Sequence, residues 1–404
     1  MGVTLARDSV SLLGAVCIGF IIFGMVACSG TPENEAPGGR PAPENSNGAL
    51  LDALGSHTGK VILGNADGTG QQIVLTPELS ARVLGAFING LSDENLVWVD
   101  DTIMAGTYFQ SKPYFWNAGG LRTWLAPEDL FFVNAGKDPE SWFVPEQLDP
   151  VPFAVVSKSS SEAVFRADID LPANIGKTYN VTIERRIGLL KQPPAVVGEL
   201  PAGVEYVGVA ETHSLTNRSD LVIGDDLPYV CLWSLLQVNP SGTTLVPIRP
   251  GYDPRKAYRE YFNPLGDRLA VRNGIISIRI DGRYRLKIGV RPEAAGKGLA
   301  YLRDDGDGTG VLFVKVFPIE ADGIYVDKPW GKESDYGDVI ELYNDDGKMG
   351  GFAEIECHGP AKRIGKGETQ SHSIKLHIFR GTLPELKNIG SALLDADLNA
   401  AKYF

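Results

Sequence analysis

The chain has 404 residues, with 38 Lys and Arg against 50 Asp and Glu, so its formal net charge at pH 7 is −12. Binding to nucleic acid needs a basic patch that meets the phosphates, and no run of Lys and Arg in this chain is longer than two residues. Composition therefore argues against nucleic acid as a partner.

The N-terminal segment carries an uncharged apolar run, residues 10–27, that ends at Cys28. Such a run partitions into a bilayer and is typical of a secretion signal. Residues 25–30, Met-Val-Ala-Cys-Ser-Gly, resemble the bacterial lipobox, in which small residues precede a cysteine that is acylated and becomes the new N-terminus. The resemblance implies a signal peptide over 1–27 and a lipid on Cys28. The alternative is a plain membrane anchor with an incidental cysteine.

By resemblance to bacterial lipoprotein sorting, the mature chain is extracytoplasmic and held to a membrane by its lipid. Ser29, rather than Asp, follows the cysteine, which favours the outer membrane if the host has one. Residues 29–48 are rich in Pro, Gly, Asn and Glu and cannot bury enough apolar surface to offset chain entropy. We therefore expect a lipidated cysteine and flexible tether over 28–48 and one folded domain over 49–404.

Strand patterns dominate the folded part. Residues 177–185 alternate apolar and polar side chains, which predicts a half-buried antiparallel strand. Asp281-Gly282 lies between two candidate strands and predicts a hairpin turn. The other candidate strands, in chain order, are 72–76, 81–88, 95–99, 163–167, 204–217, 229–238, 275–280, 283–289, 311–317, 339–343, 351–357 and 373–379.

Helix signals are few, and the clearest follows Pro384 near the C-terminus. Apolar residues there recur near helical spacing, at Leu386, Ile389, Leu393, Leu394 and Leu398. We predict an all-β fold of packed antiparallel sheets with a short C-terminal helix, and a helical share below about a fifth.

Several segments, in their order and spacing, resemble the galactose mutarotase (aldose 1-epimerase-like) superfamily; they are 76–83, 209–217, 353–360 and 365–368. Others are similar to a subgroup of uncharacterised bacterial mutarotase-like proteins, often secreted; they are 119–128, 283–289 and 343–347. The resemblance covers nearly the whole folded part. It implies an antiparallel β-supersandwich and a carbohydrate ligand. Fold analogy alone does not establish activity.

Glu356 is the first candidate catalytic residue. On a strand, Glu354 and Glu356 share one face, and two carboxylates on one face need polar partners. If that face lines a cleft, burial and the neighbouring carboxylate would raise the pKa of one of them, as a general base requires. The resemblance implies that Glu356 removes the proton of the anomeric hydroxyl, and the shared face leads us to expect that Glu354 contacts the substrate. The alternative is a solvated sheet face.

His213 is the second candidate, and it shares a strand face with Glu211, which we expect to contact the substrate. It stands four positions before Asn217, where mutarotases have a histidine that protonates the ring oxygen. Leu215-Thr216 replaces the aromatic pair that normally precedes this Asn, and we find no second sugar-binding histidine. The open alternative is a hydrogen-bonded structural histidine.

A third group, Arg122, Trp124 and Glu128, carries the side chains that recognise sugars. Tryptophan offers a flat apolar face to a sugar ring, and arginine donates paired hydrogen bonds to hydroxyls or carboxylates. Residues 283–287 place a basic strip on one strand face, with Lys287 at its end. The alternatives are core aromatics beside a surface arginine, and an exposed strand face.

Metal and cofactor signals are weak. Residues 304–310 are rich in Asp and Gly but lack the distal Glu of a calcium loop, so a hairpin turn is the better interpretation. The histidines between 358 and 377 lack zinc spacing with Cys357. No phosphate loop or dinucleotide fingerprint is present, and we expect no metal and no cofactor. Cys231 and Cys357 either pair or remain two separate thiols.

Two functions follow. In the first, the protein is a membrane-anchored lipoprotein that binds a carbohydrate and acts on it by mutarotase-type acid–base chemistry. In the second, it binds the carbohydrate without catalysis. The two are distinguished by whether Glu356 and His213 converge on one cavity.

Overall fold

The computed structural model describes residues 49–110, 112–330 and 337–404. The predicted signal peptide, Cys28 and tether lie outside this part of the chain. No helix within it combines the length and the apolar character needed to cross a bilayer.

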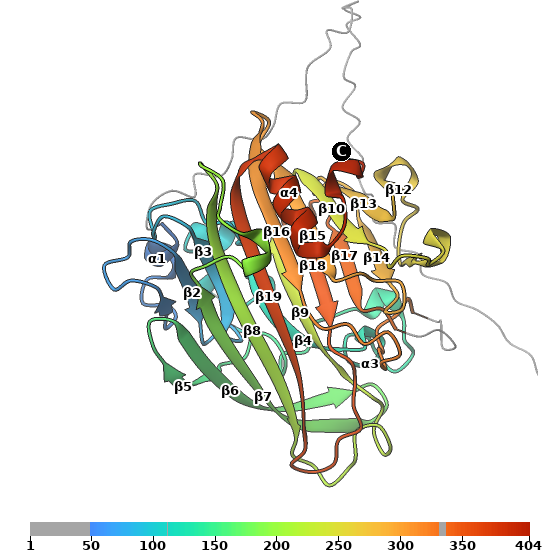
Figure 1. Ribbon diagram of the computed structural model, residues 1–404. Helices are drawn as coiled ribbons and strands as arrows, with labels where there is room; N and C mark the ends of the chain where they lie inside the picture. Colours follow the sequence, from blue (N-terminus) through green and yellow to red (C-terminus); the bar gives the residue numbers. More distant parts are fainter. Residues whose placement is uncertain (1–48, 111, 331–336) are drawn as a thin grey trace, which may run out of the picture. The chain divides into compact units, whose positions relative to one another are not determined.

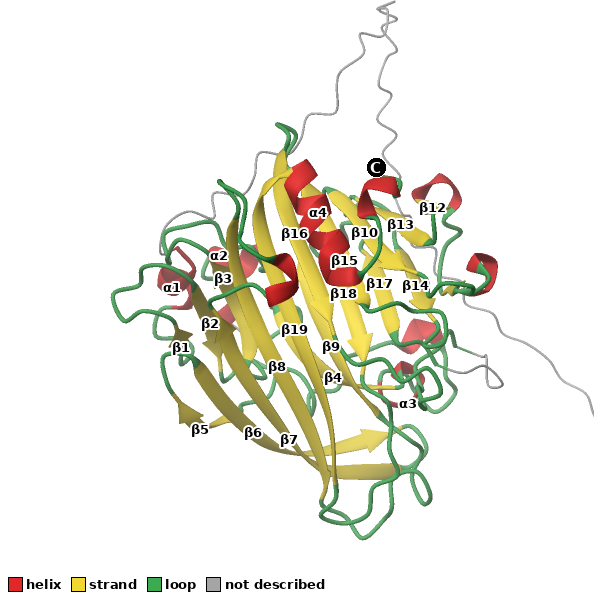
Figure 2. Ribbon diagram, viewed as in Figure 1, coloured by secondary structure: helices red, strands yellow, loops and turns green. Residues whose placement is uncertain are grey.

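Two large antiparallel sheets form the body of the described chain (Figures 1 and 2). The nine-stranded sheet has the order β1 (Val61–Leu63), β2 (Gln72–Thr76), β3 (Arg82–Phe87), β4 (Leu121–Ala126), β9 (Cys231–Val238), β18 (Ala353–His358), β17 (Ile340–Asn344), β14 (Leu286–Val290), β11 (Tyr258–Glu260). The ten-stranded sheet has the order β12 (Leu269–Arg272), β13 (Ile275–Ile280), β10 (Gly242–Pro247), β15 (Gly298–Asp304), β16 (Thr309–Val316), β19 (Thr369–Thr382), β8 (Glu205–Asn217), β7 (Lys177–Leu190), β6 (Glu162–Ala173), β5 (Ala154–Lys158).

Helices are short. They are α1 (Ala49–Leu54), α2 (Asp101–Met104), α3 (Glu128–Phe131) and α4 (Leu383–Leu394), with single 3-10 turns at Tyr108–Gln110, Pro139–Ser141, Ala195–Val197, Pro254–Lys256, Gly266–Arg268 and Leu398–Ala400. The predicted C-terminal helix is α4, which packs with its apolar face on β15 and β16. The predicted fold class, antiparallel β with a short C-terminal helix, is confirmed.

The predicted hairpin at Asp281-Gly282 is wrong. The strand before it, β13, belongs to the ten-stranded sheet, and the strand after it, β14, belongs to the nine-stranded sheet. The backbone N–H groups of Asp281 and Gly282 donate to Oδ1 of Asn344, at 3.1 and 2.9 Å, rather than to a facing strand. The turn residues therefore serve a crossover between the sheets.

The predicted strand at 95–99 is also absent. This stretch forms only an isolated bridge between Val99 and Gly119, and its amide N–H groups at Leu96 and Trp98 bond to carbonyls of Ala86 and Gln237. Cys231 and Cys357 are buried and unpaired, so the two-thiol alternative holds.

The strand β18 shows how the sheet positions the site. Every one of its side chains is buried, so both of its faces are covered. Ile355 and Cys357 face the core between the sheets, where they join one continuous apolar cluster. The alternation of a strand therefore turns Glu354, Glu356 and His358 to the opposite face.

Candidate functional site

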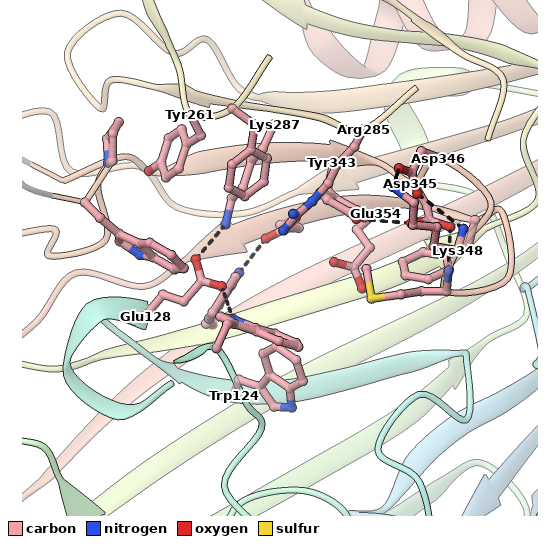
Figure 3. Close-up of a pocket in the computed structure, with 18 of the residues that line it drawn as sticks. Trp124, Glu128, Tyr261, Arg285, Lys287, Tyr343, Asp345, Asp346, Lys348 and Glu354 are labelled. Carbon is pink, nitrogen blue, oxygen red and sulfur yellow. Dashed lines mark hydrogen bonds and ion pairs between the residues drawn. The ribbon is translucent and has the colours of Figure 1, made fainter. Parts of the chain in front are cut away.

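A pocket of about 630 Å³ lies on this opposite face of the nine-stranded sheet (Figure 3). Strand register brings its residues together: Trp124 of β4 pairs with Trp233 of β9, and Tyr343 of β17 pairs with Glu354 of β18 and with Lys287 of β14. Residues directly opposite on one face lie within contact distance. The lining combines five tryptophans, other aromatics and both signs of charge: Trp116, Arg122, Trp124, Glu128, Glu140, Trp142, Trp233, Glu260, Tyr261, Phe262, Arg285, Lys287, Pro329, Trp330, Tyr343, Asp345, Asp346, Lys348, Met349, Phe352, Glu354 and Glu356.

The tryptophans give the pocket its apolar faces. Five of the six tryptophans of the chain line it. The Trp124 ring lies 5.6 Å from Trp116 and 5.5 Å from Trp233 between centroids, and Trp116 lies 5.6 Å from Trp142, each pair edge-to-face. Aromatic faces beside hydrogen-bonding groups suit a ligand with C–H faces and polar edges, as a sugar has.

Glu356 is fully buried at this pocket. Its Oε2 accepts a hydrogen bond from Nε1 of Trp233 at 2.8 Å, and its Oε1 is buried without a hydrogen-bond partner. Burial raises the pKa of Glu356 well above the usual range; Glu354 and Glu341 add to the rise, and Lys287 opposes it. The carboxyl can therefore hold a proton near neutral pH and has one oxygen free for a ligand.

Lys287 supplies the positive charge among these carboxylates. Its Nζ lies 2.8 Å from Glu341 Oε2, 3.6 Å from Glu128 Oε2 and 3.8 Å from Asp327 Oδ2. It also stands 4.8 Å from the Trp233 ring centroid. Burial lowers the pKa of the ammonium, but Glu341 and Glu128 outweigh this effect and hold it well above its usual value. Lys287 is therefore a fixed cation rather than a nucleophile.

Arg122 and Glu128 add further charged groups to the pocket wall. Nη2 of Arg122 donates to Glu354 Oε1 at 2.6 Å, and the guanidinium lies 4.3 Å from the Trp124 ring centroid. Nε1 of Trp142 donates to Glu128 Oε1 at 2.8 Å. Burial raises the pKa of Glu128, which makes it a second carboxyl able to hold a proton.

A loop after β17 forms part of the rim. Oδ2 of Asp345 accepts the backbone N–H groups of Gly347, Met349 and Gly351 at 2.9, 3.1 and 2.9 Å. Nδ2 of Asn117 donates to the carbonyl of Met349 at 2.8 Å. Asp345 and Asn117 thus fix the loop, and Met349 of this loop lines the pocket.

His213 and Glu211, the two remaining candidates from the sequence, lie outside the pocket. Both belong to β8 of the ten-stranded sheet, and neither lines the pocket. Nδ1 of His213 contacts the Thr123 hydroxyl, and Nε2 lies 3.1 Å from Glu211 Oε2. Thr123 points to the opposite face of β4 from Arg122 and Trp124. His213 therefore lies between the sheets, on the far side of the nine-stranded sheet from Glu356.

His213 lies among buried charged and polar side chains that hold it in place, as expected for a structural histidine. Glu211 forms an ion pair with Arg185 and accepts from Oγ of Ser234 at 3.0 Å. Burial lowers the pKa of His213, so the imidazole is neutral near pH 7. The structure thus brings together six of the eight candidates, Arg122, Trp124, Glu128, Lys287, Glu354 and Glu356, and separates Glu211 and His213 from them.

Family comparison places the chain among known sequences. The model of DUF6786, a family of unknown function, matches residues 46–404. The chain belongs to DUF6786. A comparison with curated proteins finds no match.

Several of the solved structures similar to this DUF6786 chain are named as mutarotase-like proteins. A candidate aldose 1-epimerase from Escherichia coli K12 is 9% identical, with a TM-score of 0.47 over 79% of this chain and 99% of its own. A galactose mutarotase-like protein from Lactobacillus casei is 13% identical, with a TM-score of 0.43 over 79% of this chain and 100% of its own. Likeness at this level carries no information about activity.

Proposed function

We propose that this DUF6786 protein is a membrane-anchored lipoprotein whose tryptophan-lined pocket binds a carbohydrate, with Glu356 as a proton-transfer group in a mutarotase-type reaction. The observation that carries the proposal is the free, buried Oε1 of Glu356 in a pocket lined by five tryptophans. The anchor rests on Cys28 and the apolar run before it, outside the described residues.

The raised pKa makes the ionised form of Glu356 a stronger base than an ordinary carboxylate. In this reaction Glu356 first releases its own proton, and its carboxylate then takes the proton of the anomeric hydroxyl while the bond from the anomeric carbon to the ring oxygen breaks. The ring oxygen needs a proton from a second group, and His213 lies on the other side of the sheet. Glu128 is the pocket carboxyl that can supply it, because burial raises its pKa. Rotation of the open-chain aldehyde and reversal of both transfers then give the other anomer.

Polarimetry on freshly dissolved α-sugars tests the catalytic part. Glu356→Gln should lower the rate by about 10²–10⁴-fold and leave sugar binding largely intact, because the amide keeps the shape of the side chain but cannot accept the proton. Glu199→Gln is the matched control, since Glu199 is an exposed carboxylate outside the pocket and its change should leave the rate unaltered. Full activity in Glu356→Gln would show that Glu356 is not the base.

Binding without catalysis is the second candidate function. The observation that favours it is the position of His213, since the acid–base pair implied by the mutarotase resemblance does not meet in the pocket. If it is correct, the wild-type chain binds a sugar with a measurable affinity and does not accelerate its mutarotation.

A further inference from the structure

A second cluster of buried side chains lies beside the pocket and is not part of its lining. Asp327, Glu341 and His358 each offer one ligand atom, and these atoms lie within 4.8 Å of one another. The three side chains are at most 1% exposed. Glu341 pairs directly with Glu356 across β17 and β18, so the cluster adjoins the catalytic carboxyl that we propose.

Unsatisfied ligand atoms distinguish this cluster from an ordinary group of acids. No hydrogen bond of ordinary geometry reaches either ring nitrogen of His358 or Oδ2 of Asp327, although the backbone of Asp338 lies beside the imidazole and Lys287 Nζ lies 3.8 Å from Oδ2. A buried polar atom without a partner is costly, and buried histidines are nearly always bonded. His358 packs against Trp233, with ring centroids 5.3 Å apart, and this contact holds its plane.

The two carboxylates are oriented by hydrogen bonds to their other oxygens. Oδ1 of Asp327 accepts the backbone N–H of Glu128 at 2.6 Å. Oε1 of Glu341 accepts the hydroxyl of Tyr261 at 2.6 Å. Bonds of this kind fix the ligands of metal ions in proteins. The other oxygens, Oε2 of Glu341 and Oδ2 of Asp327, lie 2.8 and 3.8 Å from Lys287 Nζ, so a bound ion shares them with this ammonium or displaces it.

The local charge also favours a cation. Four buried carboxyls, those of Glu128, Asp327, Glu341 and Glu356, surround the single ammonium of Lys287. Ionised buried carboxylates are tolerated only where cations or hydrogen bonds compensate them. A divalent ion would compensate carboxylates that otherwise have to hold protons to remain buried.

We propose that Asp327, Glu341 and His358 bind a divalent first-row transition-metal ion of the Zn²⁺ or Mn²⁺ class. Two carboxylate oxygens and one imidazole nitrogen suit such ions, whereas Ca²⁺ and Mg²⁺ prefer oxygen ligands alone. The sequence gives no sign of this site, because its ligands come from three separate segments without motif spacing. We expected no metal for that reason.

Metal titration of the purified full chain, after treatment with a chelator, tests the site without any sugar. Zn²⁺ measured by calorimetry should bind with one equivalent per chain, and Co²⁺ should give a visible absorption band that Zn²⁺ removes. His358→Ala should weaken binding at least about tenfold, and so should the milder Tyr261→Phe, which frees Glu341 from its orienting bond. His377→Ala is the control, since His377 is also buried but lies on β19 of the other sheet.

The site is refuted if the wild-type chain binds neither Zn²⁺ nor Co²⁺ stoichiometrically, which would show that Lys287 and bound protons suffice. It is also refuted if His358→Ala and Tyr261→Phe bind as tightly as the wild type. Because no sugar is present, failure here leaves the carbohydrate proposal standing, and failure of the carbohydrate proposal leaves this one standing.

Discussion

Replacing His213 with alanine separates a structural histidine from a catalytic one. The change removes an imidazole that is 0% exposed and leaves the Thr123 hydroxyl without its contact, whereas Oε2 of Glu211 still accepts from Ser234. A buried polar group left unsatisfied costs about 1–3 kcal/mol. Truncating a large buried ring adds a cavity, and such changes cost about 3–5 kcal/mol. Glu211 keeps Arg185 and Ser234, so only the Thr123 hydroxyl adds the polar cost, and we expect a total loss of about 4–8 kcal/mol.

Urea unfolding followed by circular dichroism measures that loss in the free energy of unfolding. Sugar affinity of the folded His213→Ala protein should stay within about twofold of the wild type, because the sheet separates this residue from the pocket. Glu356→Gln is the reciprocal comparison, with a small change in stability and a large change in rate. The reasoning fails if His213→Ala is as stable as the wild type and has lost sugar binding or mutarotation.

Three further predictions concern pH, the rim loop and the anchor. Burial raises the pKa of Asp338 to about 7, above the value of about 3.9 in an unfolded chain. The folded state therefore favours the protonated side chain, so the stability that Asp338 contributes is complete below about pH 4 and is lost as pH rises toward about 7. Asp338→Asn should flatten that fall in urea unfolding, and an unchanged pH slope would contradict it. Asp345→Ala removes the acceptor of three backbone N–H groups in the rim loop and should weaken sugar binding about tenfold, as measured by calorimetry. Asp307→Ala, at an exposed turn, is the control and should leave the sugar affinity unchanged. Cys28→Ala should abolish incorporation of labelled fatty acid, and a variant that is still labelled would refute the lipoprotein assignment.

The parts of the site that could be predicted from sequence depend on local geometry. A strand alternates its side chains, so the face shared by Glu354 and Glu356 follows from their spacing alone. The same rule places Arg122 and Trp124 together on β4. Each of these four residues lines the pocket.

The parts that could not be predicted depend on which strands become neighbours. Spacing cannot show that β8, with His213, lies in a different sheet from β18, with Glu356. For the same reason, Asp281-Gly282 reads as a hairpin although it links two sheets. Trp142 and Trp330 reach the pocket from irregular segments, where no period marks a facing side chain. Trp233 had a signal that we did not use: it lies on a candidate strand with apolar residues on both faces.

Intrinsic fluorescence gives the most direct test of the carbohydrate pocket, because five of the six tryptophans line it. Titration with a panel of neutral and acidic sugars should produce a saturable change in emission for at least one sugar. Trp142→Leu should weaken that binding by about tenfold, because it removes an aromatic face and the hydrogen-bond donor to Glu128. Trp98→Phe is the control: Trp98 lies outside the pocket lining, so this change should leave the sugar affinity unchanged. A folded protein whose emission no sugar alters, or a Trp142→Leu variant that binds as tightly as the wild type, would contradict the account.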